Sequence, residues 1–508
     1  MVLRFALLLF MVACPLAVAS AAAGSAQTAP SADPAAGLDA FIRQAMTDYR
    51  VPGAAVAVVH RGKTVFLKGY GTRRVGEDAP VDENTVFQIA SVTKTFTAAA
   101  VAALVGDGRL DWDDEVIIRL PEFALYDPYP TREATVRDLL AHRTGLPAFT
   151  GDLLGEVGYD RGEVLRRIRF VPPGASFREK ALYSNLGIFT AGEVAARVAG
   201  SSWDDVVQNR LLTPLGMTRS APSVRTAPKD DNRSGTFGWV NGRMQAITPS
   251  HQIVMGAAGS MVSTASDLSR YMRMLLGGGS LDGRPVLTAK AVDEMFEPSM
   301  VSEIGFAEAL PISQETGFGY GMTWGYYYFH GAKVLEKGGA LDGARAVIVL
   351  VPERQLGIAV VANLNLTILP EAIRAYVLEQ ELGPATANTQ ATLLEAQKTV
   401  DRLLDPDAPP ANPGRTSVPL AAFAGTYESD IYGPFVLTAA GDAINIAAGP
   451  GRYAGKLRHF SRDTFTLSWP LIDYGTQDVT FTIGPDGKPT GFSTLTFGPF
   501  KRVEPSAD

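Results

Sequence analysis

The sequence predicts a mixed α+β protein with a second, all-β domain toward its C-terminus. Strand-like runs lie at both ends of residues 38–383, and mainly helical segments lie between them. This segregation is typical of an α+β domain with a largely antiparallel sheet flanked by helices. From residue 418 on, short β-prone runs separated by Gly, Pro and Asp predict a small barrel or sandwich.

The first domain is expected to begin with a helix, whose apolar residues from Leu38 recur three and four positions apart. A hairpin with its turn at residues 61–63 follows. The remaining elements, in chain order, are a strand-like run at 85–90, helices at 95–105, 192–198 and 265–276, and strands at 345–351 and 356–363.

The C-terminal part is divided by a proline-rich stretch. Residues 384–417 read as a helix followed by a linker that has no apolar face to bury. Residues 418–505 carry the β-prone runs of the second domain, including 435–438, 443–447, 464–469, 479–483 and 492–497. We therefore expect two folded domains.

The composition excludes several classes of protein. Of the 508 residues, 46% are hydrophobic and 19% are charged, which excludes disordered, collagen-like and polytopic membrane proteins. The 46 basic and 53 acidic residues give a net charge of −7, and no basic run marks a phosphate-binding face. We expect no nucleic acid partner, and the sequence does not indicate an oligomeric state.

The N-terminal segment has the features of a secretory signal peptide. Arg4 precedes an apolar run over residues 5–18, and small residues continue to Ala26, so residues 1–26 are the expected leader. No later run reaches the 18 apolar residues that a membrane span needs. We expect a periplasmic or secreted mature chain; an uncleaved anchor is the alternative. A lipid anchor on Cys14 is less favoured, because the apolar run continues past this residue.

Several common catalytic motifs are missing from the chain. There is no H-E-x-x-H, P-loop, full G-x-G-x-x-G or G-x-S-x-G. The five histidines are scattered, and no two of them lie three or four residues apart. We expect neither a metal site nor a Ser-His-Asp triad, and no organic cofactor is implied.

One S-x-x-K sequence, Ser91 to Lys94, stands where a strand-like run meets a helix. Residues three apart on a helix share a face, so the Lys94 amine can reach the Ser91 hydroxyl. A serine needs such a base before it acts as a nucleophile, and helix N-terminal N–H groups can stabilise an oxyanion. A capping serine before a solvent-facing lysine is the commoner meaning of this short motif.

Two further motifs are unique in the chain. Tyr183 and Asn185 form a Y-x-N before a predicted helix, and Lys337 and Gly339 form a K-x-G before the last strand pair. A phenol near ammonium groups can shuttle a proton, Asn185 can orient substrate or Lys94, and Gly339 permits close backbone approach. A loop tyrosine and a turn that begins a strand are the plainer interpretations.

Taken together, these motifs resemble the serine β-lactamase and penicillin-binding-protein superfamily on its class C side, where Y-x-N replaces S-D-N. The likeness includes residues 85–90, 106–111, 139–147, 214–217 and 263–268. It covers about residues 38–383. The C-terminal segment is similar to the lipocalin-like domain of some members, including archaeal peptidases that act on D-amino-acid peptides.

The resemblance implies a role for each motif. Ser91 would be the acylated nucleophile, with Lys94 and Tyr183 sharing the proton transfers, and Asn185, Lys337 and Gly339 would bind substrate. The N–H groups of Ser91 and Ala340 would form the oxyanion hole. His142 lies in one of the similar segments, where a structural histidine that caps a helix end is the favoured interpretation.

One departure from the family pattern bears on the substrate. The middle residue of K-T-G is Gly338 here, so the hydroxyl that β-lactamases use on a substrate carboxylate is missing. Arg345 or Arg374 are candidates to replace that contact, although surface positions are the expectation for both.

We therefore expect a secreted serine hydrolase that cleaves an amide or ester in a small peptide or D-amino-acid derivative. The alternatives are a β-lactamase or D-alanyl-D-alanine carboxypeptidase, and a non-hydrolytic penicillin-binding or sensor protein. A C-terminal domain docked beside the active site would restrict the enzyme to short substrates.

Overall fold

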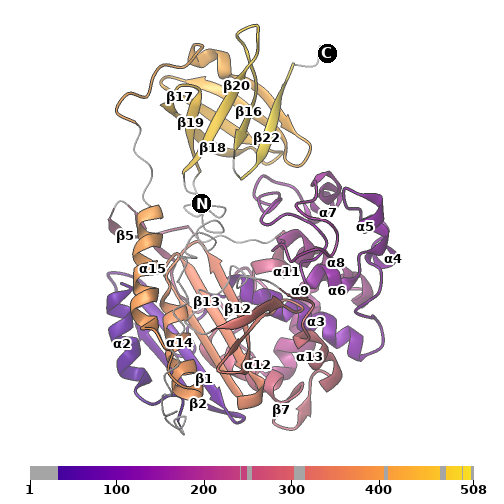
Figure 1. The fold of residues 1–508 in the computed structure, drawn as a ribbon, viewed down its shortest axis with the longest axis vertical. Coiled ribbons are helices and arrows are strands. Elements are labelled where there is room, and N and C mark those ends of the chain that lie inside the picture. The colour runs from indigo at the N-terminus through magenta and orange to yellow at the C-terminus, as the bar shows by residue number, and fades with distance from the viewer. Residues whose placement is uncertain are drawn as a thin grey trace.

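A helix-flanked sheet domain and a closed β-barrel make up the structure (Figure 1). The computed structural model describes residues 33–240, 242–248, 254–301, 315–404, 410–469, 476–494 and 496–504. The predicted leader, with Cys14, and residues 405–409 of the linker lie outside the described residues. Within the described part of the chain, no helix is long and apolar enough to cross a membrane.

An antiparallel sheet of eight strands forms the centre of the first domain, in the order β2-β1-β14-β13-β12-β11-β10-β9. The two β-rich ends of the domain meet in its middle, where β1 pairs with β14. The strands are β1 (Gly53–His60), β2 (Lys63–Gly71), β9 (Met300–Val301), β10 (Thr316–Tyr320), β11 (Gly325–Phe329), β12 (Ala332–Leu341), β13 (Ala344–Val351) and β14 (Leu356–Ala362).

The predicted first hairpin is confirmed, and its turn has a clear cause. Arg61 and Gly62 join β1 to β2 with φ values of 50° and 76°. Two successive positive φ values are the mark of a type I′ turn, whose twist matches that of the flanking strands.

The central strands are buried on both faces, because helices cover the sheet on each side. Alternate residues of β1 belong to two different apolar clusters: Ala55, Ala57 and Val59 to one, Val56 and Val58 to the other. This alternation follows from the two-residue period of a strand. It explains why these strands read as continuous apolar runs.

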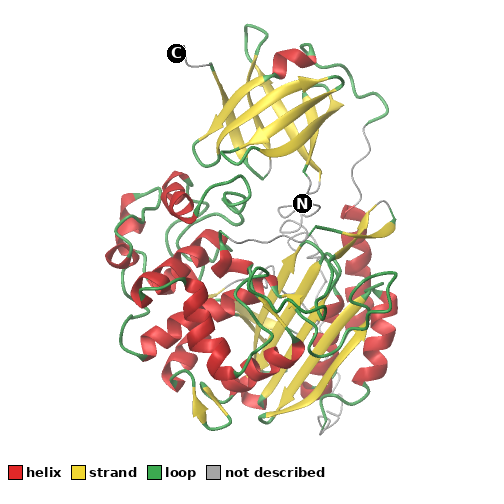
Figure 2. Ribbon diagram, turned by 180° about the vertical axis from the view of Figure 1, so that it is seen from behind, coloured by secondary structure: helices red, strands yellow, loops and turns green. Residues whose placement is uncertain are grey.

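Two groups of helices form the outer layers (Figure 2). One face carries α2 (Leu38–Asp48), α14 (Leu369–Leu382) and α15 (Thr389–Leu404). The helices of the opposite side are α3 (Thr93–Gly106), α4 (Val116–Arg119), α5 (Pro128–Glu133), α6 (Val136–Leu140), α7 (Arg161–Arg167), α8 (Asn185–Ala199), α9 (Trp203–Val207), α10 (Thr213–Leu215), α11 (Gly256–Gly259), α12 (Ala265–Leu276) and α13 (Ala289–Phe296). The predicted α+β class is therefore confirmed.

Short strand pairs complete the first domain. They are β3 (Phe87–Gln88) with β6 (Val262–Ser263), β4 (Phe237–Val240) with β5 (Arg243–Ala246), and β7 (Ser280–Leu281) with β8 (Arg284–Pro285). The run predicted as a strand at 85–90 is thus shorter than expected, because the chain turns into a helix at Ala90.

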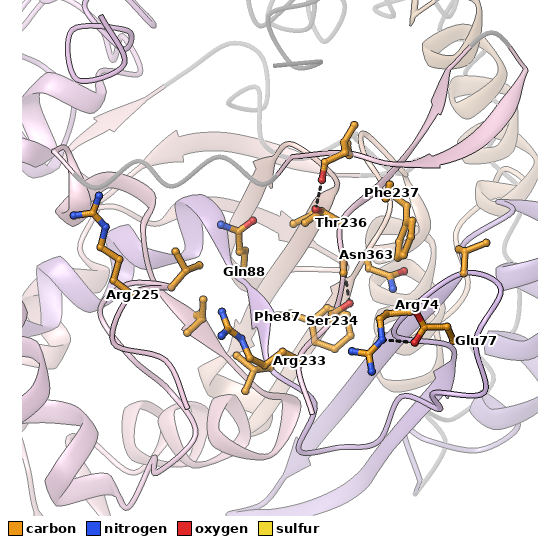
Figure 3. A pocket seen from close by; sticks show the side chains of 18 residues that line it. Arg74, Glu77, Phe87, Gln88, Arg225, Arg233, Ser234, Thr236, Phe237 and Asn363 are labelled. Atoms are coloured by element: carbon orange, nitrogen blue, oxygen red, sulfur yellow. Dashed lines mark hydrogen bonds and ion pairs between the residues drawn. The ribbon is translucent and has the colours of Figure 1, made fainter. Parts of the chain in front are cut away.

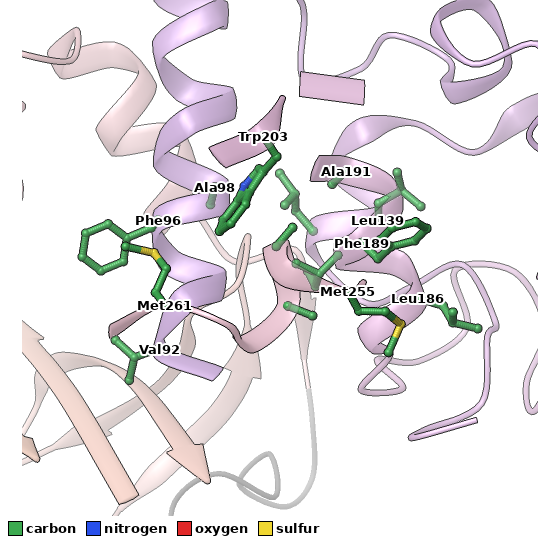
Figure 4. Close-up of a cluster of buried hydrophobic side chains, with 14 of the residues drawn as sticks. Val92, Phe96, Ala98, Leu139, Leu186, Phe189, Ala191, Trp203, Met255 and Met261 are labelled. Carbon is green, nitrogen blue, oxygen red and sulfur yellow. The ribbon is translucent and has the colours of Figure 1, made fainter. Parts of the chain in front are cut away.

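Helix α3 runs through the centre of the helical layer. Every residue from Thr93 to Leu104 is buried, as expected for a helix surrounded by other elements. Phe96 stacks on Tyr271 of α12, with ring centroids 3.9 Å apart. Figure 4 shows this helix beside apolar side chains of α8 and Trp203 of α9. The helix therefore provides a rigid base for residues at its N-terminus.

The C-terminal domain is a closed, all-antiparallel barrel of eight strands. Each strand pairs with the next in sequence, and β15 closes on β22, which is the up-and-down arrangement of lipocalins. The strands are β15 (Gly425–Ser429), β16 (Gly433–Ala440), β17 (Ala443–Ala448), β18 (Tyr453–Ser461), β19 (Thr464–Ser468), β20 (Thr476–Ile483), β21 (Pro489–Thr494) and β22 (Gly498–Val503).

Candidate active site

Ser91 lies in a strained turn that joins β3 to α3. The turn is a 3-10 helix, η1 (Ala90–Val92), and Ala90 has a φ of 48°. A residue with a Cβ atom adopts this left-handed conformation at a cost of about 1–2 kcal/mol. Ala90 and Val92 are buried, whereas Ser91 is half-buried. The turn therefore presents the Ser91 side chain at the edge of the core.

Lys94 lies one helical turn beyond Ser91, as the sequence spacing predicts. Its ammonium group is fully buried and donates to Ser91 Oγ at 2.9 Å. It also donates to the carbonyl oxygen of Ala258 in α11, at 2.6 Å. The plainer reading, a solvent-facing lysine, is wrong for this residue. The Lys94 nitrogen is therefore held within hydrogen-bond distance of the serine oxygen.

Tyr183 also contacts the Ser91 hydroxyl. Its hydroxyl donates to Ser91 Oγ at 2.6 Å. The Lys94 and Lys337 ammonium groups each lie 4.7 Å from the centroid of its ring. These two positive charges stabilise negative charge on the phenol oxygen. Lys94 and Tyr183 therefore meet at the Ser91 hydroxyl, and Lys337 lies against the ring of Tyr183.

The Y-x-N sequence is held in place by the start of α8. Ser184 caps this helix, its side chain accepting from the N–H of Gly187. Asn185 is the first helical residue, and its Nδ2 donates to Asp152 Oδ2 at 2.7 Å. Burial raises the pKa of Asp152 to about 7, although the Asn185 hydrogen bond and the Lys94 charge act to lower it. Sequence reasoning did not identify Asp152.

Lys337 lies within β12, not in a turn before a strand as the plainer reading expected. Its ammonium group is fully buried and donates to Tyr320 Oη at 2.7 Å. Tyr320 in turn donates to the carbonyl oxygen of Thr323, at 3.1 Å. Tyr320 carries no sequence signal, because it reaches Lys337 only through the pairing of β10 with β11 and of β11 with β12.

Gly339 allows β12 to pass directly beside the nucleophile turn. A Cβ atom at this position would lie 2.4 Å from the carbonyl oxygen of Ile89 and 3.0 Å from the nitrogen of Ser91. Only glycine fits between the two backbones. Ala340 follows on the same strand, so the two residues that are predicted to supply the oxyanion N–H groups lie on adjoining segments.

His142 contacts the tyrosines of the site. Its ring centroid lies 4.8 Å from that of Tyr183 and 5.1 Å from that of Tyr320. Its Nδ1 accepts from the N–H of Ser184 at 3.1 Å, so the neutral ring carries its proton on Nε2. Burial, and then the charges of two nearby lysines, holds the pKa of His142 well below its usual value. The uncharged His142 ring therefore packs against Tyr183.

The two arginines considered for a substrate carboxylate are buried, so their expected surface positions are wrong. Arg345 forms an ion pair with Glu371 and donates to the carbonyl oxygen of Gly339 at 3.0 Å. Arg374 forms an ion pair with Glu336 at 2.7 Å. Each guanidinium is already neutralised by a buried carboxylate, which leaves both poorly suited to bind another.

A cavity of about 560 Å³ lies beside the strand that leads to Ser91. Its wall includes Gln88 of β3 and Val262 of β6, with Arg225 and Arg233 on the surrounding loop (Figure 3). Gln88 precedes Ser91 by three residues, so their Cα atoms are at most about 10 Å apart. The cavity has the size of a small-ligand pocket, but Ser91, Lys94 and Tyr183 are not among the residues that line it. Within the described residues, no cluster of His, Cys, Asp or Glu could hold a metal ion.

Comparison with known proteins gives two domain matches. The family model described as Beta-lactamase matches residues 38–382. The model described as a domain of unknown function, DUF3471, matches residues 409–505. The first match covers more than half of the chain, and it includes every residue that surrounds Ser91 Oγ.

Individual proteins are similar over most of the chain. Unguisins hydrolase ungD of Aspergillus violaceofuscus is 27% identical over 495 residues, which cover 88% of this chain and 85% of that protein. The octameric penicillin-binding protein homologue from Pyrococcus abyssi has a TM-score of 0.61 and 22% identity, covering 92% and 99% of the two chains. The structure of SurE with D-Leu has a TM-score of 0.52 and 20% identity, with the same coverage. The two structures show a shared fold that includes both domains.

Proposed function

This chain belongs to the Beta-lactamase family, and from that premise we propose that it is a serine hydrolase acting through an acyl-enzyme on Ser91. The substrate is an amide or ester in a small peptide or D-amino-acid derivative. One observation carries the proposal: Ser91 Oγ lies within hydrogen-bond distance of both Lys94 Nζ and Tyr183 Oη, at 2.9 and 2.6 Å. A nucleophile and a base within this reach are the signature of covalent catalysis.

Acylation begins when Ser91 gives its proton to whichever of these two neighbours is deprotonated, Lys94 as the neutral amine or Tyr183 as the phenolate, and attacks the substrate carbonyl. The carbonyl oxygen becomes an oxyanion that the N–H groups of Ser91 and Ala340 stabilise. The C–N or C–O bond then breaks as the proton passes through Tyr183 to the leaving group. The products of this stage are a free amine or alcohol and an ester on Ser91.

Deacylation is the reverse exchange, with water in place of the leaving group. Tyr183 accepts a proton from water, whose oxygen attacks the ester carbonyl. Collapse of the second oxyanion breaks the bond to Ser91 Oγ, which recovers its proton. Lys94 and Lys337 stabilise the negative charge on Tyr183 between these transfers, because each ammonium lies 4.7 Å from its ring centroid.

Three observations support a peptide-like substrate. A relative is named as a hydrolase of unguisins, and a structure of similar fold was determined with D-Leu. In this chain the K-x-G motif has Gly338 in place of the threonine, which disfavours β-lactam hydrolysis.

The substrate class is tested with paired enantiomers. We expect kcat/KM to be at least tenfold higher for a D-amino-acid amide or ester than for its L form, and Ser91→Ala to abolish both activities while the protein stays folded. Equal turnover by Ser91→Ala would contradict the mechanism. Faster turnover of a β-lactam or of D-alanyl-D-alanine would favour those alternatives, and acylation without release would favour a penicillin-binding sensor.

We also propose that the mature protein is exported after removal of residues 1–26. The basis is the Arg4 and apolar-run pattern of the sequence. The intact mass of the protein purified from the periplasm or medium is the test. A chain that keeps Met1 would contradict this proposal without affecting the hydrolase assignment.

A further inference from the structure

The barrel docks on the helical layer through the turn between β15 and β16. The N–H of Gly151, in the loop before α7, donates to Tyr432 Oη at 2.8 Å. The Tyr159 hydroxyl donates to the carbonyl oxygen of Tyr432 at 3.2 Å. On the neighbouring turn, the N–H of Gly451 donates to the carbonyl oxygen of Val157 at 2.8 Å. Three hydrogen bonds thus join the barrel to residues 151–159.

Arg167 of α7 reinforces this contact. Its Nη1 donates to the carbonyl oxygens of Asp430 and Ile431, at 3.0 and 2.9 Å. Its guanidinium carbon lies 3.9 Å from the centroid of the Tyr159 ring. Tyr432 is 1% exposed and belongs to an apolar cluster that continues from the helical layer into the barrel. A buried tyrosine hydroxyl requires a partner, and here the partner is a backbone N–H of the other domain.

The same loop also contacts both functional residues of the Y-x-N motif. The N–H of Phe149 donates to the carbonyl oxygen of Tyr183 at 3.2 Å, and the two rings lie 5.4 Å apart. Asp152 accepts from Asn185 at 2.7 Å. Gly151, the residue bonded to the barrel, stands between these two contacts in the chain. A displacement of the loop at Gly151 therefore moves groups that touch Tyr183 and Asn185.

We propose that Tyr432 of the barrel is a positioning residue of the active site, acting through Gly151 on the loop of residues 149–152. The proposal rests on the proposed function, because it assigns the barrel a part in that same reaction. The barrel then contributes to turnover of every substrate. A domain that only limited substrate length would affect long substrates alone.

The test compares two tyrosine variants of the full-length chain. Tyr432→Phe removes the hydroxyl that bonds to Gly151. Tyr427→Phe is the matched control, since the buried Tyr427 hydroxyl donates to the carbonyl oxygen of Phe423 within the barrel, at 3.0 Å. We expect Tyr432→Phe to lower kcat/KM for a small chromogenic ester roughly tenfold, because an unpaired Gly151 N–H favours conformations in which the loop has moved away from Tyr183 and Asn185. Tyr427→Phe should leave it within twofold.

A double-mutant cycle separates positioning from general destabilisation. If Tyr432 acts through Asp152, Tyr432→Phe should cause little further loss in an Asp152→Ala background. Losses that multiply in the double variant would exclude the route through Asp152, and an unchanged kcat/KM in Tyr432→Phe would overturn the proposal.

Amide hydrogen exchange gives a readout that needs no activity. Tyr432→Phe should accelerate exchange in the peptide that contains Gly151, and Tyr427→Phe should not. Unchanged exchange in Tyr432→Phe would overturn the positioning role. If the wild-type chain forms no acyl-enzyme, the proposed function fails, and the exchange result then decides separately whether Tyr432 holds the loop.

Discussion

Replacement of Gly339 by alanine tests how closely β12 must approach the nucleophile. The added Cβ atom would lie 2.4 Å from the Ile89 carbonyl oxygen and 3.0 Å from the Ser91 nitrogen. Ordinary contacts begin near 3.4 Å, so the strand or the turn must move by about 1 Å. Both segments carry a proposed oxyanion N–H, and a misplacement of about 1 Å can reduce catalysis about 100-fold. That loss corresponds to about 2.7 kcal/mol of transition-state stabilisation.

The assay is kcat/KM for a chromogenic ester, measured beside the thermal unfolding midpoint. Gly325→Ala on the neighbouring strand is the control, because its Cβ atom would first meet the Glu336 carbonyl oxygen at 3.5 Å, an ordinary contact. We expect the control to retain activity within threefold. A folded Gly339→Ala variant with kcat/KM within threefold of wild type would refute the close-approach argument.

Three further predictions concern buried ionisable side chains. Burial raises the pKa of Asp138, but hydrogen bonds, first from Arg178, outweigh this and hold it below the usual value. Its carboxylate therefore stabilises the fold above about pH 4 and loses this effect as the pH falls through the lowered pKa. Asp138→Asn should cost about 2 kcal/mol in urea unfolding at pH 7, and progressively less as the pH is lowered below about 4. Arg374→Met should cost about 3–5 kcal/mol by leaving Glu336 buried without its cation, and adding Glu336→Gln should recover part of this in thermal unfolding. The pKa of His142 is depressed in the folded protein, so below about pH 6.5 the unfolded chain binds a proton that the folded chain does not. The free energy of unfolding should therefore decrease as the pH falls below this value. His142→Gln should flatten that part of the curve.

The parts of the site that local sequence determines could be predicted. The spacing of Ser91 and Lys94 places both on one helical face, and helix periodicity alone makes their contact possible. The hairpin turn at Arg61 and Gly62 could be predicted for a similar reason, because it depends only on residues that are neighbours in the chain. The assignment of alternate β1 residues to the two faces of the sheet could not be predicted, because helices cover both faces and every position before His60 is apolar.

The remaining parts depend on tertiary placement. Tyr320 reaches Lys337 only through the register of three strands, and Asp152 reaches Asn185 from a loop with no motif. Arg374 looked like a surface residue, because its buried partner Glu336 is 38 positions away in the chain. Long-range ion pairs of this kind leave no trace in local composition. Similarly, nothing in the barrel sequence indicates that Tyr432 bonds to the other domain.

The most direct test of the central claim is the covalent state of Ser91 during turnover. Mature protein mixed rapidly with a chromogenic D-amino-acid ester, quenched within milliseconds and examined by intact-mass and peptide-mapping mass spectrometry, should show one acyl group on the peptide that contains Ser91. The burst of released chromophore should match the amount of this adduct, and Ser91→Ala should show neither. Full turnover with no adduct at any quench time, or an adduct that persists in Ser91→Ala, would contradict the account.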